Sequence, residues 1–370
     1  MKKTTNSDQK VKLSKFAYFC FGLLAISLIL YAIAINNVEF ANFFNKYISS
    51  IFRGAFALVS NIIPLSIAEL FIICSPIILI FLIRYCIKKY AKSWRDMGIF
   101  GLSVLAFISL LFSVFILNFG VAYHTTTLDK RLELDKNKVH ANELAQTANW
   151  LVEEINALAN KIDFEENSSS NMPYTIREMN NKLLDAYSKV SEKYDFISKL
   201  TSYIKPIMLS EPMTYTFISG VYTFFTGEAN LNTNAPDYSL VYTTAHELAH
   251  QRGIAREDEA NFIAFLVCLE SDDDYIRYCG YMNVFEYVIS SLRSADIKLW
   301  EETCQKLDIR AIYEINACSK HYDKYRDNVV GEISGAINDA YLQANGTQGS
   351  VSYGLVVDLA VAYFHKNIEN

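Results

Sequence analysis

Hydrophobic positions are concentrated in the first third of this 370-residue chain. Three stretches there, residues 16–35, 67–87 and 99–123, have the roughly 20 apolar residues that a bilayer-spanning helix needs. Glu69 stands at the edge of the second stretch, which suits an interfacial position better than a buried one. Residues 1–124 are therefore predicted to form a membrane anchor with three transmembrane helices. Between the first two stretches, residues 37–64 form either an interfacial helix or a loop packed on the rest of the protein.

A helical period replaces the continuous apolar runs after residue 125. Apolar residues recur at alternating steps of four and three within 139–163 and again within 174–199, which is typical of helices with one apolar face. The two helices predict an antiparallel hairpin on the membrane side, a stalk over residues 125–200.

Strand residues first become frequent around position 220. Residues 218–226 favour a strand bounded by Gly220 and Gly227, and a polar turn is expected at 230–236. Helical patterns resume at about Leu240, with breaks at 272–274 and 345–346. The predicted fold class is a mainly α membrane protein in which residues 201–370 form an α+β domain with a small sheet.

Charge divides the chain at the same place. Residues 1–124 hold 12 basic and 4 acidic residues, whereas residues 125–370 hold 22 and 36. An acidic globular part argues against nucleic acid as a partner, because neutralising phosphates requires basic clusters. The lipid bilayer is the partner expected for the first part.

Basic residues in the short loops predict the orientation, because cytoplasmic loops are enriched in them. Only Lys46 and Arg53 lie between the first two stretches. Ten lie on the other side, before the first stretch or between the second and third: Lys2, Lys3, Lys10, Lys12, Lys15, Arg84, Lys88, Lys89, Lys92 and Arg95. The N-terminus is therefore expected in the cytoplasm, and everything after about residue 125 outside it. Residues 32–34 also resemble a signal-peptide cleavage site, but cleavage there would leave the domain on the same side.

The seven cysteines include no CxxC pair, which argues against a thiolate zinc cluster. Cys268 sits in an apolar run and is expected to be a buried thiol. The sequence leaves the disulfide state of Cys279, Cys304 and Cys318 open.

The chemistry is concentrated in His246-Glu247-Leu248-Ala249-His250, an HExxH motif inside a helical pattern. Residues four apart share a helix face, so both imidazoles can bind one Zn²⁺. Glu247 would then take a proton from a zinc-bound water. The expected activity is hydrolysis of a peptide or protein substrate.

A catalytic zinc needs a third protein ligand. Gly253 suits the end of the first helix, and Glu257, Asp258 and Glu259 all lie in the first turn of a second one. Glu257 shares its face with Asn261, and then with small residues. The residues that share a helix face with Asp258 or with Glu259 are large and apolar from the next turn onward. Those faces are therefore expected to pack into the core, with the two acidic side chains at the solvent edge. This pattern favours Glu257 as the third ligand, with Glu259 as the alternative.

The string HELAHQRG, followed by AREDEANF, resembles the domain of unknown function 3810 family of bacterial membrane proteins, which belong to the zincin-like metallopeptidases. Similar too are the three N-terminal spans, TGEAN at 226–230, and the closing Tyr353-Gly354 with 356–359. The resemblance implies a zincin-like peptidase domain. Residues 257–261 also look like the ExxAD element of membrane zinc peptidases related to the CAAX prenyl protease, which implies that Glu257 is the zinc ligand and that Asn261 replaces an Asp.

Some expectations stay open at this level. In zincins a strand ahead of the motif lines the cleft, and the strand at 220–227 stands in the right order for that role. Tyr353, His321 and Arg326 are candidates, by chemistry alone, for stabilising an oxyanion. Two other functions compete with a peptidase: a zinc-binding membrane sensor or scaffold without turnover, and a zinc amidase acting on cell-wall material. An intact Glu247 argues against the sensor.

Overall fold

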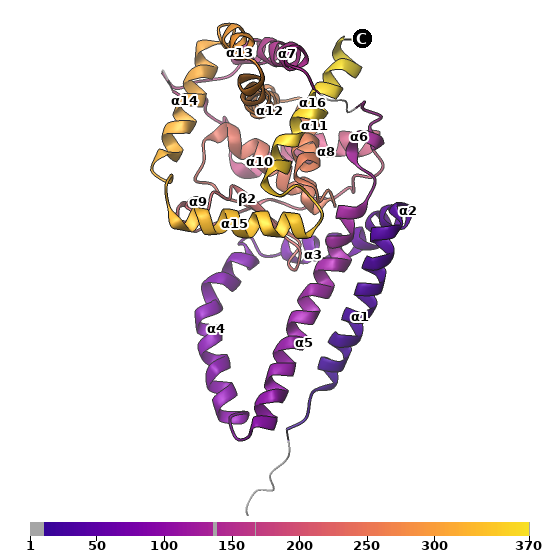
Figure 1. The fold of residues 1–370 in the computed structure, drawn as a ribbon. Coiled ribbons are helices and arrows are strands. Elements are labelled where there is room, and N and C mark those ends of the chain that lie inside the picture. Colours follow the sequence, from indigo (N-terminus) through magenta and orange to yellow (C-terminus); the bar gives the residue numbers. More distant parts are fainter. Residues whose placement is uncertain (1–10, 136–138, 167, 370) are drawn as a thin grey trace, which may run out of the picture.

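The computed structural model describes residues 11–135, 139–166 and 168–369 (Figure 1). Three of the lysines used for the orientation, Lys2, Lys3 and Lys10, lie outside the described residues. The described chain is mainly helical with one three-stranded sheet, as the predicted fold class requires.

Within the described residues, three helices are long and apolar enough to cross a membrane: α1 (Lys15–Asn36), α4 (Ile67–Lys89) and α5 (Trp94–Asn118). α1 packs along α5, whereas α4 stands apart from this pair (Figure 1). The third prediction ran to residue 123, but α5 ends at Asn118 and residues 120–124 form the 3₁₀ helix η2 (Gly120–His124). Polar contacts hold Asn118 at this end: its backbone carbonyl accepts a hydrogen bond from the Arg53 guanidinium, and its side-chain amide donates to the Phe224 carbonyl.

The segment between α1 and α4 is helical: α2 (Val38–Phe43), the π-helix η1 (Phe44–Ser49) and α3 (Ser50–Ser60). Arg53 and Ala57 on α3 are buried, whereas Ile51, Leu58 and Val59 are exposed. α3 therefore has one face against the protein and one apolar face without protein cover, which matches an interfacial helix.

Helices after residue 125 share one hydrophobic core, and residues from 125–200 and from 201–370 both contribute to it. Its main members are α7 (Ala141–Ala159), α8 (Ile176–Lys193), α10 (Asp237–Gln251), α11 (Glu257–Leu269), α12 (Asp274–Ala295) and α16 (Val356–Phe364). α7 packs against α12, and α8 against α11. The expected stalk is wrong: the apolar faces of both helices are buried in this core, and α7 lies on the side away from the long helices (Figure 1).

Further helices complete the domain: α6 (Leu128–Arg131), α9 (Ser210–Thr214), α13 (Ile297–Cys304), α14 (Ile309–Asp323), α15 (Val329–Ala344), η3 (Gly349–Leu355) and η4 (His365–Glu369). The predicted breaks are confirmed, since α11 and α12 meet around 270–273 and α15 ends just before Asn345. α15 lies across the face of the domain that is turned toward the long helices (Figure 1).

The sheet has the order β1-β3-β2, from β1 (Lys205–Pro206), β2 (Gly220–Thr223) and β3 (Glu228–Leu231). β2 and β3 are antiparallel, so the predicted single strand is a hairpin with its turn at 224–227. Asn230, expected in a turn, lies in β3, where its side-chain N–H donates to the Val221 carbonyl at 3.1 Å. β1 was not predicted. β2 remains an edge strand.

Two carboxylates join the domain to α4. Glu228 of β3 accepts from the backbone N–H groups of Ile67 and Ala68 at 3.0 Å and pairs with buried Lys205 at 2.5 Å. Glu69 in the first turn of α4 accepts from Met208 and Leu209. Negative charge at a helix N-terminus is favourable. Glu69 is thus at the end of its helix, as expected, but the domain covers it and it is buried.

All seven cysteines lie in the described residues and are free thiols. Cys268 is fully buried, which confirms the prediction, and burial raises the pKa of its thiol.

Candidate metal centre and cleft

Helix α10 carries the HExxH motif. It begins after Pro236, with Asp237 in its first turn, and ends at Gln251. Its four-residue spacing puts His246 and His250 on one face, with their rings 4.6 Å apart between centroids. Both imidazoles are buried, as is Glu247 between them in sequence.

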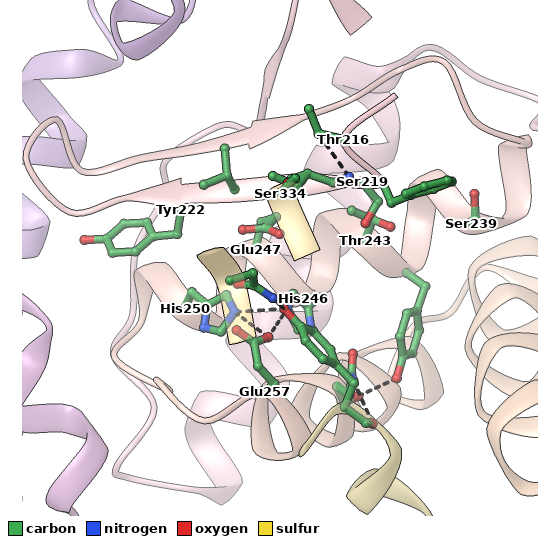
Figure 2. Close-up of a pocket in the computed structure, with 18 of the residues that line it drawn as sticks. Thr216, Ser219, Tyr222, Ser239, Thr243, His246, Glu247, His250, Glu257 and Ser334 are labelled. Carbon is green, nitrogen blue, oxygen red and sulfur yellow. Dashed lines mark hydrogen bonds and ion pairs between the residues drawn. The ribbon is translucent and has the colours of Figure 1, made fainter. Parts of the chain in front are cut away.

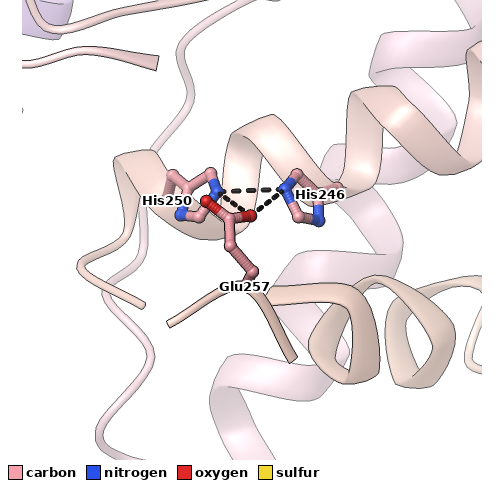
Figure 3. Close-up of side chains that lie close together, drawn as sticks. All are labelled: His246, His250 and Glu257. Carbon is pink, nitrogen blue, oxygen red and sulfur yellow. Dashed lines mark hydrogen bonds and ion pairs between the residues drawn. The ribbon is translucent and has the colours of Figure 1, made fainter. Parts of the chain in front are cut away.

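Three side-chain atoms converge beside this face (Figure 3). The Nε2 atoms of His246 and His250 lie 3.0 Å apart, and Oε2 of Glu257 lies 3.1 Å and 3.3 Å from them. Tetrahedral zinc with bonds of about 2.0–2.1 Å requires ligand atoms about 3.3 Å apart. The triangle therefore has the dimensions of three zinc ligands.

Glu257 reaches the histidines because the chain reverses after α10 and α11 starts at this residue. The alternative ligand, Glu259, points elsewhere: its carboxylate accepts from the Leu128 N–H at 2.9 Å and from Arg256 at 2.8 Å. Of the three acidic residues considered, only Glu257 belongs to the converging group. Glu259 is buried rather than at the solvent edge, because Arg256 compensates its charge.

The converging side chains are oriented by further contacts. The Nδ1–H of His250 donates to the Ile254 carbonyl at 2.7 Å, which leaves Nε2 facing Glu257. Such bonds hold the ring and tautomer of a metal-binding histidine. Just after the motif, the Gln251 amide donates to Gly227 at 2.7 Å, and the Arg252 guanidinium lies 3.9 Å from the ring centre of Tyr187.

Gly253 connects this centre to the membrane segment. Its φ of 91° ends α10, and a Cβ there would lie 2.3 Å from Nη2 of Arg53. Asn45 donates to the Gly253 carbonyl at 3.0 Å, and Arg53 donates to the Asn45 carbonyl at 3.0 Å. The turn between α10 and α11 therefore rests on η1 and α3.

The charges of the site are strongly coupled. Burial raises the pKa of Glu257, but attraction to His250 and His246 outweighs it and holds this pKa well below its usual range. Burial lowers the pKa of His250, but attraction to Glu257 raises it to about 9. The pKa of Glu247 is raised by burial, against the lowering effects of the histidines and the Tyr222 N–H. Glu257 is therefore the anionic member of the group, and Glu247 the more basic carboxylate.

A cleft of about 600 Å³ opens beside the three converging atoms (Figure 2). β2 forms one wall with Gly220, Val221 and Tyr222. α15 contributes its small residues, which are Gly331, Ser334, Gly335 and Asn338. Glu247 lies between β2 and the histidines (Figure 2), so it can contact a group bound in the cleft.

Three tyrosines that the sequence did not single out together also line the cleft: Tyr123 of η2, Tyr341 of α15 and Tyr353 of η3. The hydroxyls of Tyr123 and Tyr341 lie 3.3 Å apart. Burial raises the pKa of all three, and the charge of Glu257 raises it further. They are therefore neutral hydrogen-bond donors at physiological pH.

Tyr353 alone among the three suggested oxyanion stabilisers lines the cleft. His321 contacts the Asn234 carbonyl at 3.1 Å, and Arg326 pairs with Asp323 at 3.2 Å on the exposed surface. Neither lines the cleft, so both expectations are wrong. Tyr123 and Tyr341 carried no sequence signal beyond their residue type.

Asn261 lies where the helical stripe predicted. It is buried, lines the same cleft and donates to the Tyr353 carbonyl at 3.4 Å. Its contact is therefore with a tyrosine of the cleft wall.

Comparison with known proteins gives one match. A protein family described as "Protein of unknown function (DUF3810)" matches residues 40–361. No curated protein and no solved structure matches the chain. The matched range begins in α2 and ends in α16, so it includes α10 and α11, the sheet and α15.

Proposed function

The chain belongs to the DUF3810 family, whose function is unknown, and we propose that it is a membrane-anchored, zinc-dependent metallopeptidase acting outside the cytoplasm. The observation that carries the proposal is the convergence of His246, His250 and Glu257 next to a carboxylate, Glu247, that is not part of the triangle. The proposed fold of the domain is accordingly zincin-like.

Zn²⁺ is the metal proposed, held by two imidazoles and one carboxylate. This donor set is typical of catalytic zinc, which keeps one position open, whereas structural sites use four protein ligands. Among the described residues the group has three members. Bound zinc polarises a carbonyl and lowers the pKa of a bound water to about 7.

Glu247 is the proposed general base. Its carboxylate takes a proton from the attacking water and then delivers it to the nitrogen of the leaving amine. Burial raises the pKa of Glu247, which makes it a better proton acceptor than an exposed carboxylate. A scaffold without turnover gives no reason for a basic carboxylate at this place.

The cleft supports a peptide as substrate. β2 is the edge strand of the sheet and lines the cleft, so an extended peptide can pair with it by strand addition. The neutral tyrosines that line the cleft can donate to the oxyanion of the tetrahedral intermediate, and Tyr353 is the first candidate. This edge strand favours a peptidase over a cell-wall amidase.

The location is part of the proposal. α1, α4 and α5 cross the cell membrane, with the N-terminus in the cytoplasm and the domain after residue 125 outside. Protease added to intact spheroplasts should digest the domain. If the domain is protected from protease until the membrane is permeabilised, the proposed orientation is wrong and the domain lies in the cytoplasm.

The activity test uses the full-length protein in detergent. Metal analysis should find one zinc per chain. The zinc-loaded protein should cleave members of a peptide library. Chelation of the zinc should abolish this cleavage, and adding zinc back should restore it. A zinc-loaded protein that cleaves no library peptide, but releases peptides from the sugar chains of the cell wall, would contradict the peptidase proposal and support the amidase alternative.

A further inference from the structure

Helix α15 presents three different faces. Gly331, Ser334 and Asn338 face the cleft. Glu332 and Gln343 are exposed on a second, polar face. A third face carries an apolar stripe of four side chains that are between 54% and 67% exposed: Val329, Val330, Ile333 and Ile337. A helix with separate polar and apolar exposed faces is suited to the boundary between water and lipid.

Contacts place α15 at the level where the long helices end. The ring of Tyr341 in α15 lies 6.1 Å from that of Phe115, which is in the last turn of α5. Near the other end of α15, Phe217 is exposed and lies against Gly331. α15 therefore crosses the face of the domain that is turned toward the spans (Figure 1).

The same face has further apolar exposure. Met208 and Leu209, which bind the first turn of α4 through Glu69, are both exposed. Leu58 and Val59 of α3 are exposed as well. Because the three spans determine the position of the bilayer, these side chains and the stripe of α15 lie at one apolar surface next to it.

We propose that α15 lies in the outer bilayer interface with its apolar stripe among the lipids, and that the cleft behind it takes polypeptides that are themselves anchored in the membrane. The second part rests on the proposed peptidase function. Membrane-anchored chains are the substrate class because one helix, α15, forms both the cleft wall and the lipid contact.

The dimensions predict where such a substrate is cut. A helix with its side chains is about 10–12 Å across, and this is the thickness that separates the cleft from the lipid. An extended chain covers about 3.3 Å per residue, so roughly three or four residues bridge that distance. Cleavage is therefore expected within the first few residues outside the membrane anchor. Tethering also raises the effective concentration of the substrate at the cleft.

The lipid contact is tested by fluorescence, independently of hydrolysis. Full-length Ile333→Trp protein, in a Trp94→Phe background that removes the exposed tryptophan of α5, is reconstituted in vesicles of phosphatidylcholine with brominated acyl chains. Glu332→Trp is the matched control, because the neighbouring position is turned by about 100° onto the polar face. Trp150 and Trp300 remain in both proteins, so the quantity compared is the emission that each substitution adds to the Trp94→Phe parent. We expect the emission added by Ile333→Trp to be quenched at least twofold and that added by Glu332→Trp to be unchanged. Equal emission in brominated and ordinary lipid overturns the proposal; a blue-shifted but unquenched spectrum would mean that a protein, such as a second copy, covers the stripe.

The substrate class is tested with one peptide sequence in two forms. A sequence that the peptide library identifies is offered to the zinc-loaded protein in vesicles, either free or fused four residues from a hydrophobic transmembrane helix. We expect the anchored form to be cut at least tenfold faster at equal bulk concentration. Equal rates would overturn the inference and leave the proposed function intact, whereas no cleavage of either form would contradict both.

Discussion

Gly220 of the edge strand and Glu247 of the motif helix are in direct contact: a Cβ on Gly220 would lie 2.6 Å from Cγ of Glu247. The strand that lines the cleft therefore also limits the position of the proposed base. The Tyr222 N–H, two residues along the same strand, interacts with this carboxylate.

Gly220→Ala tests this contact. The added methyl group must displace Glu247, so we expect kcat to fall by about 10–100-fold, part of what a general base contributes, with zinc still bound. Gly335→Ala is the control, because it lines the same cleft and a Cβ there meets nothing within 4 Å. The measurements are the steady-state hydrolysis rate and the zinc content of both variants. Equal rates for the two variants would exclude a role for Gly220 in positioning Glu247.

Glu257→Ala should weaken zinc binding by at least 100-fold, because it removes one of three ligands. Glu259→Ala should leave the zinc affinity within a few-fold and instead lower the free energy of unfolding by about 1–3 kcal/mol, since Arg256 and the Leu128 N–H lose their acceptor. Competition with a zinc-binding dye and thermal unfolding give the two quantities. Loss of zinc in the Glu259 variant alone would contradict the ligand assignment.

Zinc binding should release protons. The pKa of His250 in the metal-free protein is raised to about 9, so at pH 7.5 this imidazole carries a proton that zinc must displace. The raised pKa also means that the stabilising His250–Glu257 pair is fully present below pH 6.5, and is lost as the pH rises through about 9. Calorimetry in buffers with different ionisation enthalpies should show close to one proton released per zinc. A binding enthalpy that is the same in all buffers would contradict this coupling.

The link between the sheet and α4 makes a stability prediction. Glu228→Gln leaves Lys205 charged and buried without its partner, which should cost about 3–5 kcal/mol of unfolding free energy. Adding Lys205→Met should recover a large part of that loss. Thermal unfolding of the detergent-solubilised variants measures both; a double variant no more stable than Glu228→Gln would mean that the N–H contacts to α4 dominate.

Features that depend on residues close together in the sequence were predicted well from local patterns. The long apolar runs gave α1 and α4 to within about two residues of their ends, because length and composition decide such helices. The position of Glu257 was predictable too, since one turn separates the two helices and the helical stripe is a local property.

Features made by distant segments were not predictable. Tyr123 and Tyr341 lie 218 residues apart in the sequence but line one cleft, and no periodicity marks either of them, whereas Tyr353 could be named only by its chemistry. The stalk prediction failed because an apolar helix face indicates burial but not the partner, and α7 and α8 are buried in the common core. Arg53 was counted only as a loop charge, although it is buried beneath the turn at Gly253.

The most direct test of the central claim, zinc-dependent hydrolysis with Glu247 as base, is the paired zinc content and peptide-hydrolysis rate of wild type and Glu247→Gln. The substitution keeps the shape of the side chain and removes the proton acceptor. Both proteins should bind one zinc per chain, and the variant should be slower by about 10²–10⁴-fold. A zinc-loaded Glu247→Gln protein that hydrolyses peptides at the wild-type rate would contradict the account.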